Sequence, residues 1–522
     1  MSLTLLPEVL RRHALVLGGA AVTLVLAASL FSRFSLQTGL TRDESIYAYG
    51  GQQTVEGVPF YVSIFDMKPP LATIIAGGGV AAARVLGLED LTGIRLAFFV
   101  FACLSVLAVY LLVTWLFSSV AAGLIAAATF ASFKGFALDA LTGPNAKTPG
   151  IFFAVLSMAL LVRRHYFWGG LAGSLAFLVW QPLALYVGVA VLAALLTPEG
   201  KRRLRLAGEA LAGAAIPIVV TVVYFWLEGA LDDLVDGAFV LPVTHLERGD
   251  SLDVRLERLE RTIDNYYSET ALLFYGGLVL VLVLAALRIV QRRHDLRALA
   301  REDPFINVIL VSFLFTAAVP AVDFQGYPDL YALLPYAAIG IGGGFSLVLD
   351  RFERARLPWV GAAAAAAAVI ALVVVSWNTY SDQPVQLRTA HPLSVQRFHA
   401  ARIEDFLEEG ETPYVLGNAT PLVLTERRNP SPYIYLAAGV DSWAVDQTPG
   451  GVEGWQAEIV AEDPPLIVLG GQWRSEIATE MKRWLNETYE RVRRGDYLVY
   501  LRPEVYDRAE RRGLVPRRAD SN

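Results

Sequence analysis

The chain has 522 residues, of which 55% are apolar and 18% are charged, and its mean hydropathy is +0.45. Runs of about 18 or more apolar residues recur, and each could cross a hydrocarbon core about 30 Å thick, which places the chain among polytopic membrane proteins. The single cysteine, Cys103, excludes a disulfide framework and a cysteine metal cluster, and the net charge of −6 gives no reason to expect a nucleic-acid partner.

Clusters of arginine and lysine determine the predicted topology, because such clusters near the ends of spans stay on the cytoplasmic side. They are Arg11-Arg12, Arg163-Arg164, Lys201 to Arg205, Arg288 to Arg301 and Arg351 to Arg356. The chain between two clusters must then cross an even number of times. The predicted spans are 14–34, 93–117, 120–138, 147–163, two within 166–197, 207–227, 271–288, 304–322, 330–349 and 357–377. This prediction gives about eleven spans and a cytoplasmic N-terminus.

The apolar segment 70–87 is predicted to lie in or dip into the outer interface instead of spanning. It is rich in glycine and alanine, begins with Pro69-Pro70 and carries Arg84. With this segment outside, the number of crossings between the first two basic clusters is even. Residues 34–92 then form the first outer loop.

The tail from 378 to 522 is charged, and it is predicted to form a small α/β domain outside the membrane. Helical periodicity covers residues 394–409, and a second helix is expected at 475–488. Short buried strands are expected at 414–416, 466–469 and 497–500. The predicted fold is therefore mostly α: a transmembrane helical bundle over 1–377, followed by an extracytoplasmic α/β domain over 378–522.

Ionisable side chains gather on the predicted outer side, where charges held near a bilayer are costly and usually functional. They are Arg42, Asp43, Glu44, Asp66, Lys68, Arg84, Arg95, Asp139, Lys147, Asp323 and Asp329. The predicted cytoplasmic side carries mainly arginine clusters. Any chemistry is therefore expected on the outer side.

Asp43 and Glu44 are the candidate catalytic residues of the first outer loop. A carboxylate there could take the proton of a hydroxyl that attacks the anomeric carbon of a sugar. A phosphate leaving group departs without protonation, so one base is enough for inversion. The competing interpretation of the acidic pair is a solvated helix start.

Lys68, which precedes Pro69-Pro70, is the candidate cation for a donor phosphate. A fixed cation stabilises the charge that a departing phosphate gains, whereas a lysine that snorkels to the lipid headgroups is the alternative. Arg42 and Arg95 are candidates for further phosphate contacts. Interfacial anchoring is the alternative for Arg95.

Other polar and aromatic side chains of the outer loops are candidates for binding the substrates. They are Tyr61, Asp66, Asp139, Lys147, Asp323 and Tyr327. Polar hairpin turns and interfacial aromatic belts are the ordinary alternatives. No cofactor is required, although Asp43 and Asp139 together with a phosphate could hold Mg²⁺ or Mn²⁺.

The order of motifs in residues 41–71 resembles the first outer loop of the GT-C membrane glycosyltransferases. The acidic pair is followed by Gly57-x-Pro59-Phe60-Tyr61 and then by Phe65-Asp66-x-Lys68-Pro69-Pro70-Leu71. Aminoarabinose transferases, protein O-mannosyltransferases and archaeal dolichyl-phosphate-mannose mannosyltransferases belong to this group. The resemblance implies that Asp43 is the base, that Lys68 contacts the donor phosphate and that Asp139 is the acid of the second outer loop.

The resemblance implies an inverting glycosyltransferase. It would move a hexose, mannose-like or modified, from a polyprenyl- or dolichyl-phosphate donor to a lipid-linked glycan or cell-surface acceptor at the outer face of the membrane. Two other classes stay open: a transporter or flippase of lipid-linked sugars, which would carry ionisable groups near mid-membrane, and a non-catalytic glycan-binding scaffold. The sequence leaves the sugar, the acceptor, the use of a metal and the oligomeric state undetermined.

Overall fold

The computed structural model describes residues 8–198, 200, 202–245, 251–322, 324–381, 391–470 and 473–517. The chain forms two compact units. The helical unit comprises Met1–Ser35, Phe98–Thr221 and Gly249–Pro384, and the mixed unit comprises Leu36–Ala97, Val222–Arg248 and Val385–Asn522.

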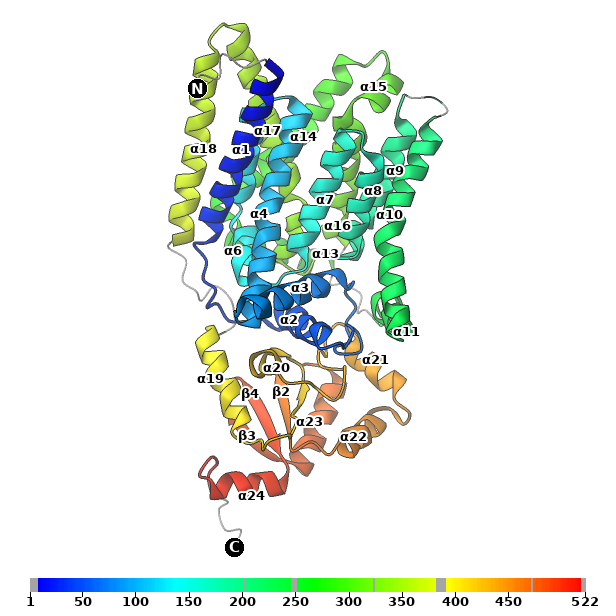
Figure 1. Ribbon diagram of the computed structural model, residues 1–522, viewed down its shortest axis with the longest axis vertical. Coiled ribbons are helices and arrows are strands. Elements are labelled where there is room, and N and C mark those ends of the chain that lie inside the picture. Colours follow the sequence, from blue (N-terminus) through cyan, green and yellow to red (C-terminus); the bar gives the residue numbers. More distant parts are fainter. Residues whose placement is uncertain are drawn as a thin grey trace. The chain divides into compact units, whose positions relative to one another are not determined.

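Long helices packed side by side make up the helical unit, as Figure 1 shows for α14, α17 and α18. Its elements are α1 (Glu8–Phe31), α4 (Asp90–Phe117, which starts in the mixed unit), α5 (Val120–Ala131), α6 (Lys134–Thr142), α7 (Lys147–Val162), α8 (Tyr166–Phe177), η2 (Gln181–Ala184), α9 (Leu185–Leu196), α10 (Arg202–Leu227, which ends in the mixed unit), α13 (Leu252–Tyr266), η4 (Ser268–Thr270), α14 (Ala271–Gln291), α15 (Leu296–Glu302), η5 (Phe305–Leu310), α16 (Val311–Val322), η6 (Tyr327–Ala332), α17 (Leu334–Arg354) and α18 (Pro358–Ser381).

The close packing of α14 against α17 depends on glycine. A Cβ atom added to Gly340 would lie 1.9 Å from the carbonyl oxygen of Gly277, and one added to Gly277 would lie 2.3 Å from that of Ala337. No side chain tolerates such distances, so a larger residue at either position would push the helices apart. Small residues at helix crossings are typical of membrane bundles, where backbones approach closely.

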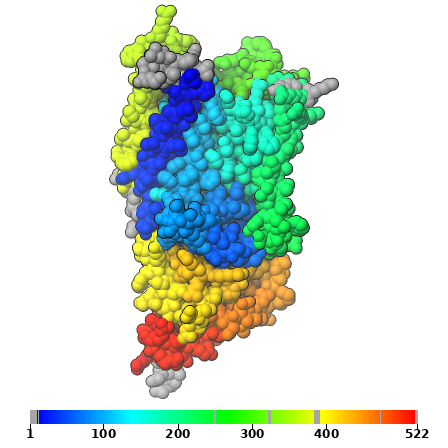
Figure 2. All heavy atoms as spheres, in the orientation of Figure 1, coloured from blue at the N-terminus to red at the C-terminus, as the bar shows by residue number. Residues whose placement is uncertain are grey.

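Six helices of the described chain are long and apolar enough to cross a membrane, and the number rises to eight if each of two bent helix pairs is one span. The bent pairs are α5 with α6, at 72°, and α15 with η5 and α16, at 82°. Apolar side chains also cover the surface: Leu17 and Val25 of α1 are 70% and 67% exposed, and Figure 2 shows α1 along the face of the helical unit. The chain is therefore an integral membrane protein.

Three of the predicted spans are short helices. Segment 147–163 forms α7, of 16 residues, and the two segments within 166–197 form α8 and α9, of 12 residues each. A 12-residue helix is about 18 Å long, which is shorter than a hydrocarbon core of about 30 Å. The expected turn at Trp180-Gln181-Pro182 is present as η2. Of the eleven or so predicted spans, at most eight correspond to described helices that are long and apolar enough to cross a membrane.

The mixed unit combines the first loop with the C-terminal segment around a small sheet. Its helices are α2 (Arg42–Val55), α3 (Leu71–Leu86), α11 (Leu231–Val235), η3 (Asp236–Val240), α12 (Leu241–Thr244), α19 (Leu393–Glu404), α20 (Thr420–Thr425), α21 (Val440–Gln447), α22 (Gly451–Ala461), α23 (Glu476–Thr488) and α24 (Pro503–Arg511). Segment 70–87 is helical, as predicted, and its position in an interface stays a prediction.

The sheet has four strands in the order β1-β2-β4-β3. The strands are β1 (Tyr414–Leu416), β2 (Leu466–Gly470), β3 (Glu490–Arg494) and β4 (Tyr497–Leu501). β1 is parallel to β2, and the other pairs are antiparallel. The three predicted strands are confirmed because β1 and β2 are continuous buried apolar runs and β4 is nearly so. β3 was not predicted, because its sequence Glu-Arg-Val-Arg-Arg buries only Val492 at the sheet edge.

The first loop and the C-terminal segment are joined by hydrogen bonds within the mixed unit. The side-chain amide of Gln396 pairs with both backbone groups of Leu40 at 2.8 Å. The Phe65 N–H donates to the carbonyl of Pro432 at 2.9 Å. These contacts attach the C-terminal segment to the loop that carries the predicted base. The domain boundary at residue 377 stays a prediction.

Candidate active site

Helix α2 begins with a capping box that separates the two neighbouring acids. The Glu44 N–H donates to the Thr41 hydroxyl at 3.3 Å, and the Thr41 N–H donates to Glu44 Oε2 at 2.8 Å. Glu44 is buried and is used as a cap. Asp43 is exposed in the first helical turn, where the helix dipole favours a carboxylate. Only Asp43 is therefore open to a substrate.

Lys68 and Asp66 form an ion pair at the end of the first loop. Lys68 Nζ lies 3.2 Å from Asp66 Oδ2, and the Asp66 side chain is fully buried whereas that of Lys68 is 26% exposed. The Met67 N–H donates to Asp66 Oδ1 at 2.8 Å. Pro69-Pro70 follow directly, and α3 starts at Leu71. The ammonium group is thus held by a buried partner and a restricted backbone.

Tyr435, from the loop before α21, joins these groups. Its hydroxyl donates to Asp43 Oδ1 at 2.9 Å. Lys68 Nζ lies 4.8 Å from the centre of the Tyr435 ring, and the guanidinium carbon of Arg42 also lies 4.8 Å from it. The centre of the Tyr47 ring is 5.5 Å from Lys68 Nζ. A carboxylate and two cations are therefore gathered around one aromatic side chain.

The electrostatics keep Lys68 charged. Burial by itself would lower the pKa of Lys68, but its neighbours, Asp66 first among them, more than offset this and hold the pKa well above the usual value. Burial raises the pKa of Asp66, and the Lys68 ammonium opposes part of that increase. Burial also raises the pKa of Tyr435, so its phenol stays protonated and can donate to Asp43.

Tyr61 supports the backbone of Lys68. Its hydroxyl donates to the Lys68 carbonyl at 2.8 Å, and its ring, fully buried, packs against Phe60 and Phe225 with centroids 4.5 and 5.5 Å apart. Its φ of 72° lies in the left-handed region, which is strained for a residue other than glycine. Such strain is often found at functional sites.

Arg95 lies at the start of α4 and is 1% exposed. Its guanidinium donates to the carbonyl oxygens of Leu36 and Thr38, the latter at 2.6 Å. These bonds hold the segment that leads into the Thr41 cap.

Asp139 is the centre of a polar cluster in the helical unit. Its carboxylate accepts the hydroxyls of Tyr327 at 2.9 Å and Tyr331 at 2.7 Å, and the amide of Asn145 at 2.6 Å. Asp139 is fully buried. The three donors satisfy the carboxylate within the protein and tie α6 to η6.

Lys147 belongs to the same region of the helical unit. It forms an ion pair with Asp329, and its Nζ lies 4.7 Å from the centre of the Trp180 ring. Asp329 also accepts the backbone N–H groups of Gln325 at 2.7 Å and Gly326 at 3.1 Å. Asp323, which was also predicted to bind substrate, lies outside the described residues.

The predicted site residues thus fall into two groups. Arg42, Asp43, Asp66, Lys68 and Tyr61 come together in the mixed unit, and Asp139, Lys147 and Tyr327 come together in the helical unit. The sequence prediction missed Tyr435, and it also missed Asp329 as the partner of Lys147. The only sequence signal for Tyr435 is the aromatic alternation in Tyr433-Ile434-Tyr435. Among the described residues, no three His, Cys, Asp or Glu side chains lie close enough to share a metal ion.

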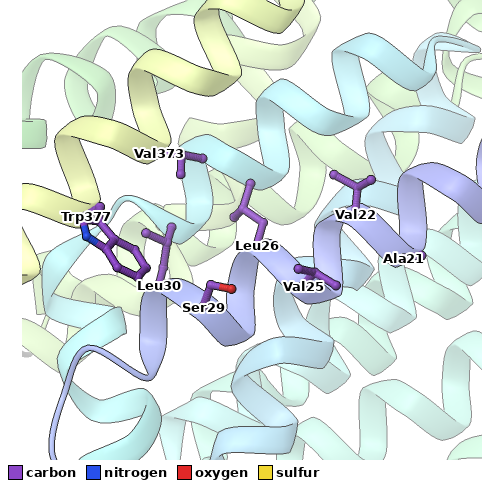
Figure 3. A pocket seen from close by; sticks show the side chains of 8 residues that line it. All are labelled: Ala21, Val22, Val25, Leu26, Ser29, Leu30, Val373 and Trp377. Carbon is purple, nitrogen blue, oxygen red and sulfur yellow. The ribbon is translucent and has the colours of Figure 1, made fainter.

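An apolar groove of about 440 Å³ runs between α1 and α18 in the helical unit (Figure 3). It is lined by Ala21, Val22, Val25, Leu26, Ser29, Leu30, Val373 and Trp377. The Arg33 guanidinium carbon lies 4.4 Å from the centre of the Trp377 ring, and the guanidinium N–H groups donate to the Ser381 hydroxyl at 3.1 and 2.6 Å. This lining suits a hydrocarbon chain of a membrane lipid.

Comparison with known proteins gives matches among solved structures. No protein-family model matches the chain, and no curated sequence is similar to it. The crystal structure of ArnT from Cupriavidus metallidurans bound to undecaprenyl phosphate matches with a TM-score of 0.59 and 15% identity, over 93% of this chain and 97% of that chain. The apo structure of the same protein gives 0.58 and 15%, over 94% and 98%.

An oligosaccharyltransferase also matches. The crystal structure of the Archaeoglobus fulgidus enzyme in complex with Zn and sulfate gives a TM-score of 0.50 and 15% identity, over 86% of this chain and 68% of that chain. The two matched proteins share one membrane-protein superfamily. At this identity the likeness establishes the fold of the chain.

Proposed function

Because this chain has the fold of the GT-C membrane glycosyltransferases, we propose that it is a glycosyltransferase that uses a polyprenyl-phosphate sugar. The observation that carries the proposal is the exposed Asp43 carboxylate, gathered with the Lys68 and Arg42 cations around Tyr435. The undecaprenyl phosphate bound to ArnT supports a polyprenyl-phosphate donor. We propose a hexose as the sugar, and a lipid-linked glycan or cell-surface polymer as the acceptor.

The proposed reaction is a single displacement with inversion. The acceptor hydroxyl oxygen forms a bond to the anomeric carbon, and the bond from that carbon to the phosphate oxygen breaks. Asp43 takes the hydroxyl proton, and the polyprenyl phosphate leaves with the electron pair and an added negative charge. Lys68 and Arg42 stabilise that charge, which is larger in the transition state than in the bound donor.

The other predicted site residues take supporting roles in this proposal. Asp66 and Tyr61 hold the Lys68 side chain and backbone, Glu44 caps α2, and Arg95 holds the segment before it. In the helical unit, Lys147 is proposed to contact a substrate, while Asp139 orients Tyr327 and Tyr331. The N-terminus is proposed to be cytoplasmic and the C-terminal segment extracytoplasmic.

A transporter of lipid-linked sugars is the second candidate, because the helical unit contains two sharply bent helix pairs. Broken helices that line a path are typical of secondary transporters. A transporter moves the intact lipid-linked sugar, whereas a transferase forms a new glycosidic bond. The fate of a labelled sugar therefore separates the two functions.

The test uses the full-length protein in nanodiscs with undecaprenyl- and dolichyl-phosphate hexoses that carry a radiolabelled sugar, and with membrane extract as the acceptor source. We expect the label to appear covalently on an acceptor. Asp43→Asn should lower the rate at least 100-fold while expression and thermal stability stay normal. The control is Glu487→Gln, which changes an exposed carboxylate on α23 of the same unit and should transfer as wild type.

Near-normal transfer by Asp43→Asn would refute the role of the base. Flux of intact donor across proteoliposomes without covalent transfer would favour the transporter. Mass spectrometry of cell-envelope glycans from a deletion strain would then identify the sugar, because its residue would be missing from the acceptor.

A further inference from the structure

We propose that Tyr435 is a positioning residue that sets the proposed base and the two phosphate-binding cations in their working arrangement. This inference rests on the proposed function and extends it to the C-terminal segment of the chain. The Tyr435 hydroxyl orients Asp43, and the Tyr435 ring holds Lys68 and Arg42. Each half of the side chain serves a different substrate.

The two halves of the side chain make different main contacts, although the hydroxyl also accepts the Arg42 guanidinium at 3.5 Å, the outer limit of a hydrogen bond. The hydroxyl donates to Asp43 Oδ1 at 2.9 Å and so fixes the orientation of the carboxylate. The ring centre lies 4.8 Å from both Lys68 Nζ and the Arg42 guanidinium carbon. Both cations are within the distance at which an aromatic face attracts a positive charge. Tyr435 itself is 8% exposed, so it has little freedom to move.

The backbone around Tyr435 is fixed from two sides within the mixed unit. The carbonyl of Pro432 accepts the Phe65 N–H of the first loop at 2.9 Å, and the carbonyl of Ile434 accepts the Gly417 N–H, just after β1, at 2.6 Å. The Phe65 ring also stacks on Trp443 at 5.7 Å and 15°. The tyrosine is therefore delivered by a segment bound both to the sheet and to the first loop.

This arrangement solves an electrostatic problem. Two cations that must meet one phosphate repel each other before the phosphate arrives. The Asp66 carboxylate offsets part of the Lys68 charge, and the Tyr435 ring attracts both cations without adding a further negative charge beside the phosphate. Because the cations and the base are already positioned, less conformational entropy is lost when the substrates bind.

Two substitutions separate the halves of the side chain. Tyr435→Phe keeps the ring and removes the hydroxyl, and it should lower kcat about tenfold with the donor KM unchanged, because one hydrogen bond to a charged group is lost. Tyr435→Leu removes both, and it should also raise the donor KM about three- to thirtyfold, the range expected for lost cation–π contacts. A purely structural role would lower the folded fraction and leave kcat and KM of the folded protein unchanged.

The control is Tyr433→Phe, which removes a hydroxyl from the same segment. Tyr433 contacts Phe65 and Trp455 and should behave as wild type. A second measurement needs no turnover: undecaprenyl phosphate alone is titrated onto the protein in nanodiscs. Tyr435→Leu should bind it more weakly by the same three- to thirtyfold, and Tyr435→Phe should bind it as wild type.

The outcomes distinguish the two proposals. A wild-type protein that binds undecaprenyl phosphate with the expected dependence on the ring but transfers no sugar would overturn the proposed function and support the ring's role. A wild-type enzyme that transfers sugar, with Tyr435→Phe and Tyr435→Leu equal to it, would overturn only the role of Tyr435. Tighter binding by Tyr435→Leu would also overturn that role, because the ring would then block the phosphate site.

Discussion

Asp43 and Glu44 are neighbours in the sequence, but their side chains meet different surroundings. The Glu44 carboxylate closes the capping box of α2 and is buried, and the Asp43 carboxylate is exposed and accepts the Tyr435 hydroxyl. A pattern of two acids after a span cannot say which one faces a substrate. The N-cap threonine three residues before Glu44 is the signal that makes the distinction.

The first prediction concerns Glu44. Glu44→Ala should lower the free energy of unfolding by about 1 kcal/mol, because the Thr41 N–H loses its partner. Glu44→Gln should restore it, since glutamine also completes a capping box. Transfer per folded molecule should stay normal in both variants. Thermal unfolding and kinetics check these outcomes, and a well-folded but inactive Glu44→Gln would show that Glu44 takes part in the reaction.

The second prediction concerns the ion pair of Lys68 with Asp66. Burial raises the pKa of Asp66, and Lys68→Met would remove the ammonium that opposes this increase. The folded variant then keeps a proton on Asp66 that the unfolded chain, with a carboxyl pKa near 3.8, releases. Its free energy of unfolding should therefore fall as the pH rises above about 4.

The size of the effect follows from the burial of Asp66. At pH 8 the deficit of Lys68→Met relative to wild type should be roughly 3 kcal/mol, and at pH 5 it should be smaller. Thermal unfolding in detergent at the two pH values measures the difference. The matched control is Lys68→Met/Asp66→Asn, in which the deficit should lose its pH dependence. An equal deficit at both pH values in the single variant would contradict this account of the pair.

At the scale of elements, the π-helical turn η3 packs directly on the first loop within the mixed unit. A Cβ atom added to Gly237 would lie 2.6 Å from Cδ1 of Tyr61 and 2.8 Å from the carbonyl oxygen of Asp66. The glycine therefore allows η3 to approach the two residues that hold Lys68. The short helix is part of the support of the candidate site.

The third prediction follows from this approach. Gly237→Ala should displace Tyr61 and Asp66, destabilise the protein by about 1–3 kcal/mol and lower transfer through a higher donor KM. Gly208→Ala is the control, because a Cβ atom there meets nothing within 4 Å. It should be neutral or slightly stabilising, as expected for alanine in a helix. Equal behaviour of the two variants would show that η3 does not support the site.

Helices and strands with a clear hydrophobic pattern in their own sequence could be predicted. Those that form because of contacts with distant parts of the chain could not. The strands at 414–416 and 466–469 are buried apolar runs, and their sequences were sufficient. β3 is a charged edge strand that exists because β4 offers it a partner. The segment 166–197 has the composition of two spans, but η2 uses part of its length, so α8 and α9 are short. Tyr435 could not be placed because nothing in a sequence reports which loop faces Asp43, 392 residues away.

At the scale of the whole molecule, the untested prediction is the orientation in the membrane. The basic clusters predict that the first loop faces outside and that residues 288–301 face the cytoplasm. The single cysteine, Cys103, is buried, so a thiol reagent should react mainly with cysteines introduced at exposed positions. Val62 in the first loop is 38% exposed, and Arg293 between α14 and α15 is also exposed.

The fourth prediction uses these positions in a Cys103→Ala background. A membrane-impermeant maleimide added to intact cells should label Val62→Cys and should leave Arg293→Cys unlabelled until the cells are opened. Both variants should transfer sugar normally, which shows that the labelled protein is folded. If Arg293→Cys were labelled in intact cells and Val62→Cys were not, the topology would be the reverse of the predicted one.

The groups around Tyr435 come from opposite ends of the polypeptide, Asp43 and Lys68 from near its beginning and the tyrosine from its last fifth. The ribosome has therefore synthesised α1 to α18 before it adds this tyrosine. Until then, the carboxylate and the two cations lack the side chain that brings them together. The candidate site can therefore be completed only when translation is almost finished. A chain truncated before Tyr435 would still contain the apolar helices but would lack this part of the site.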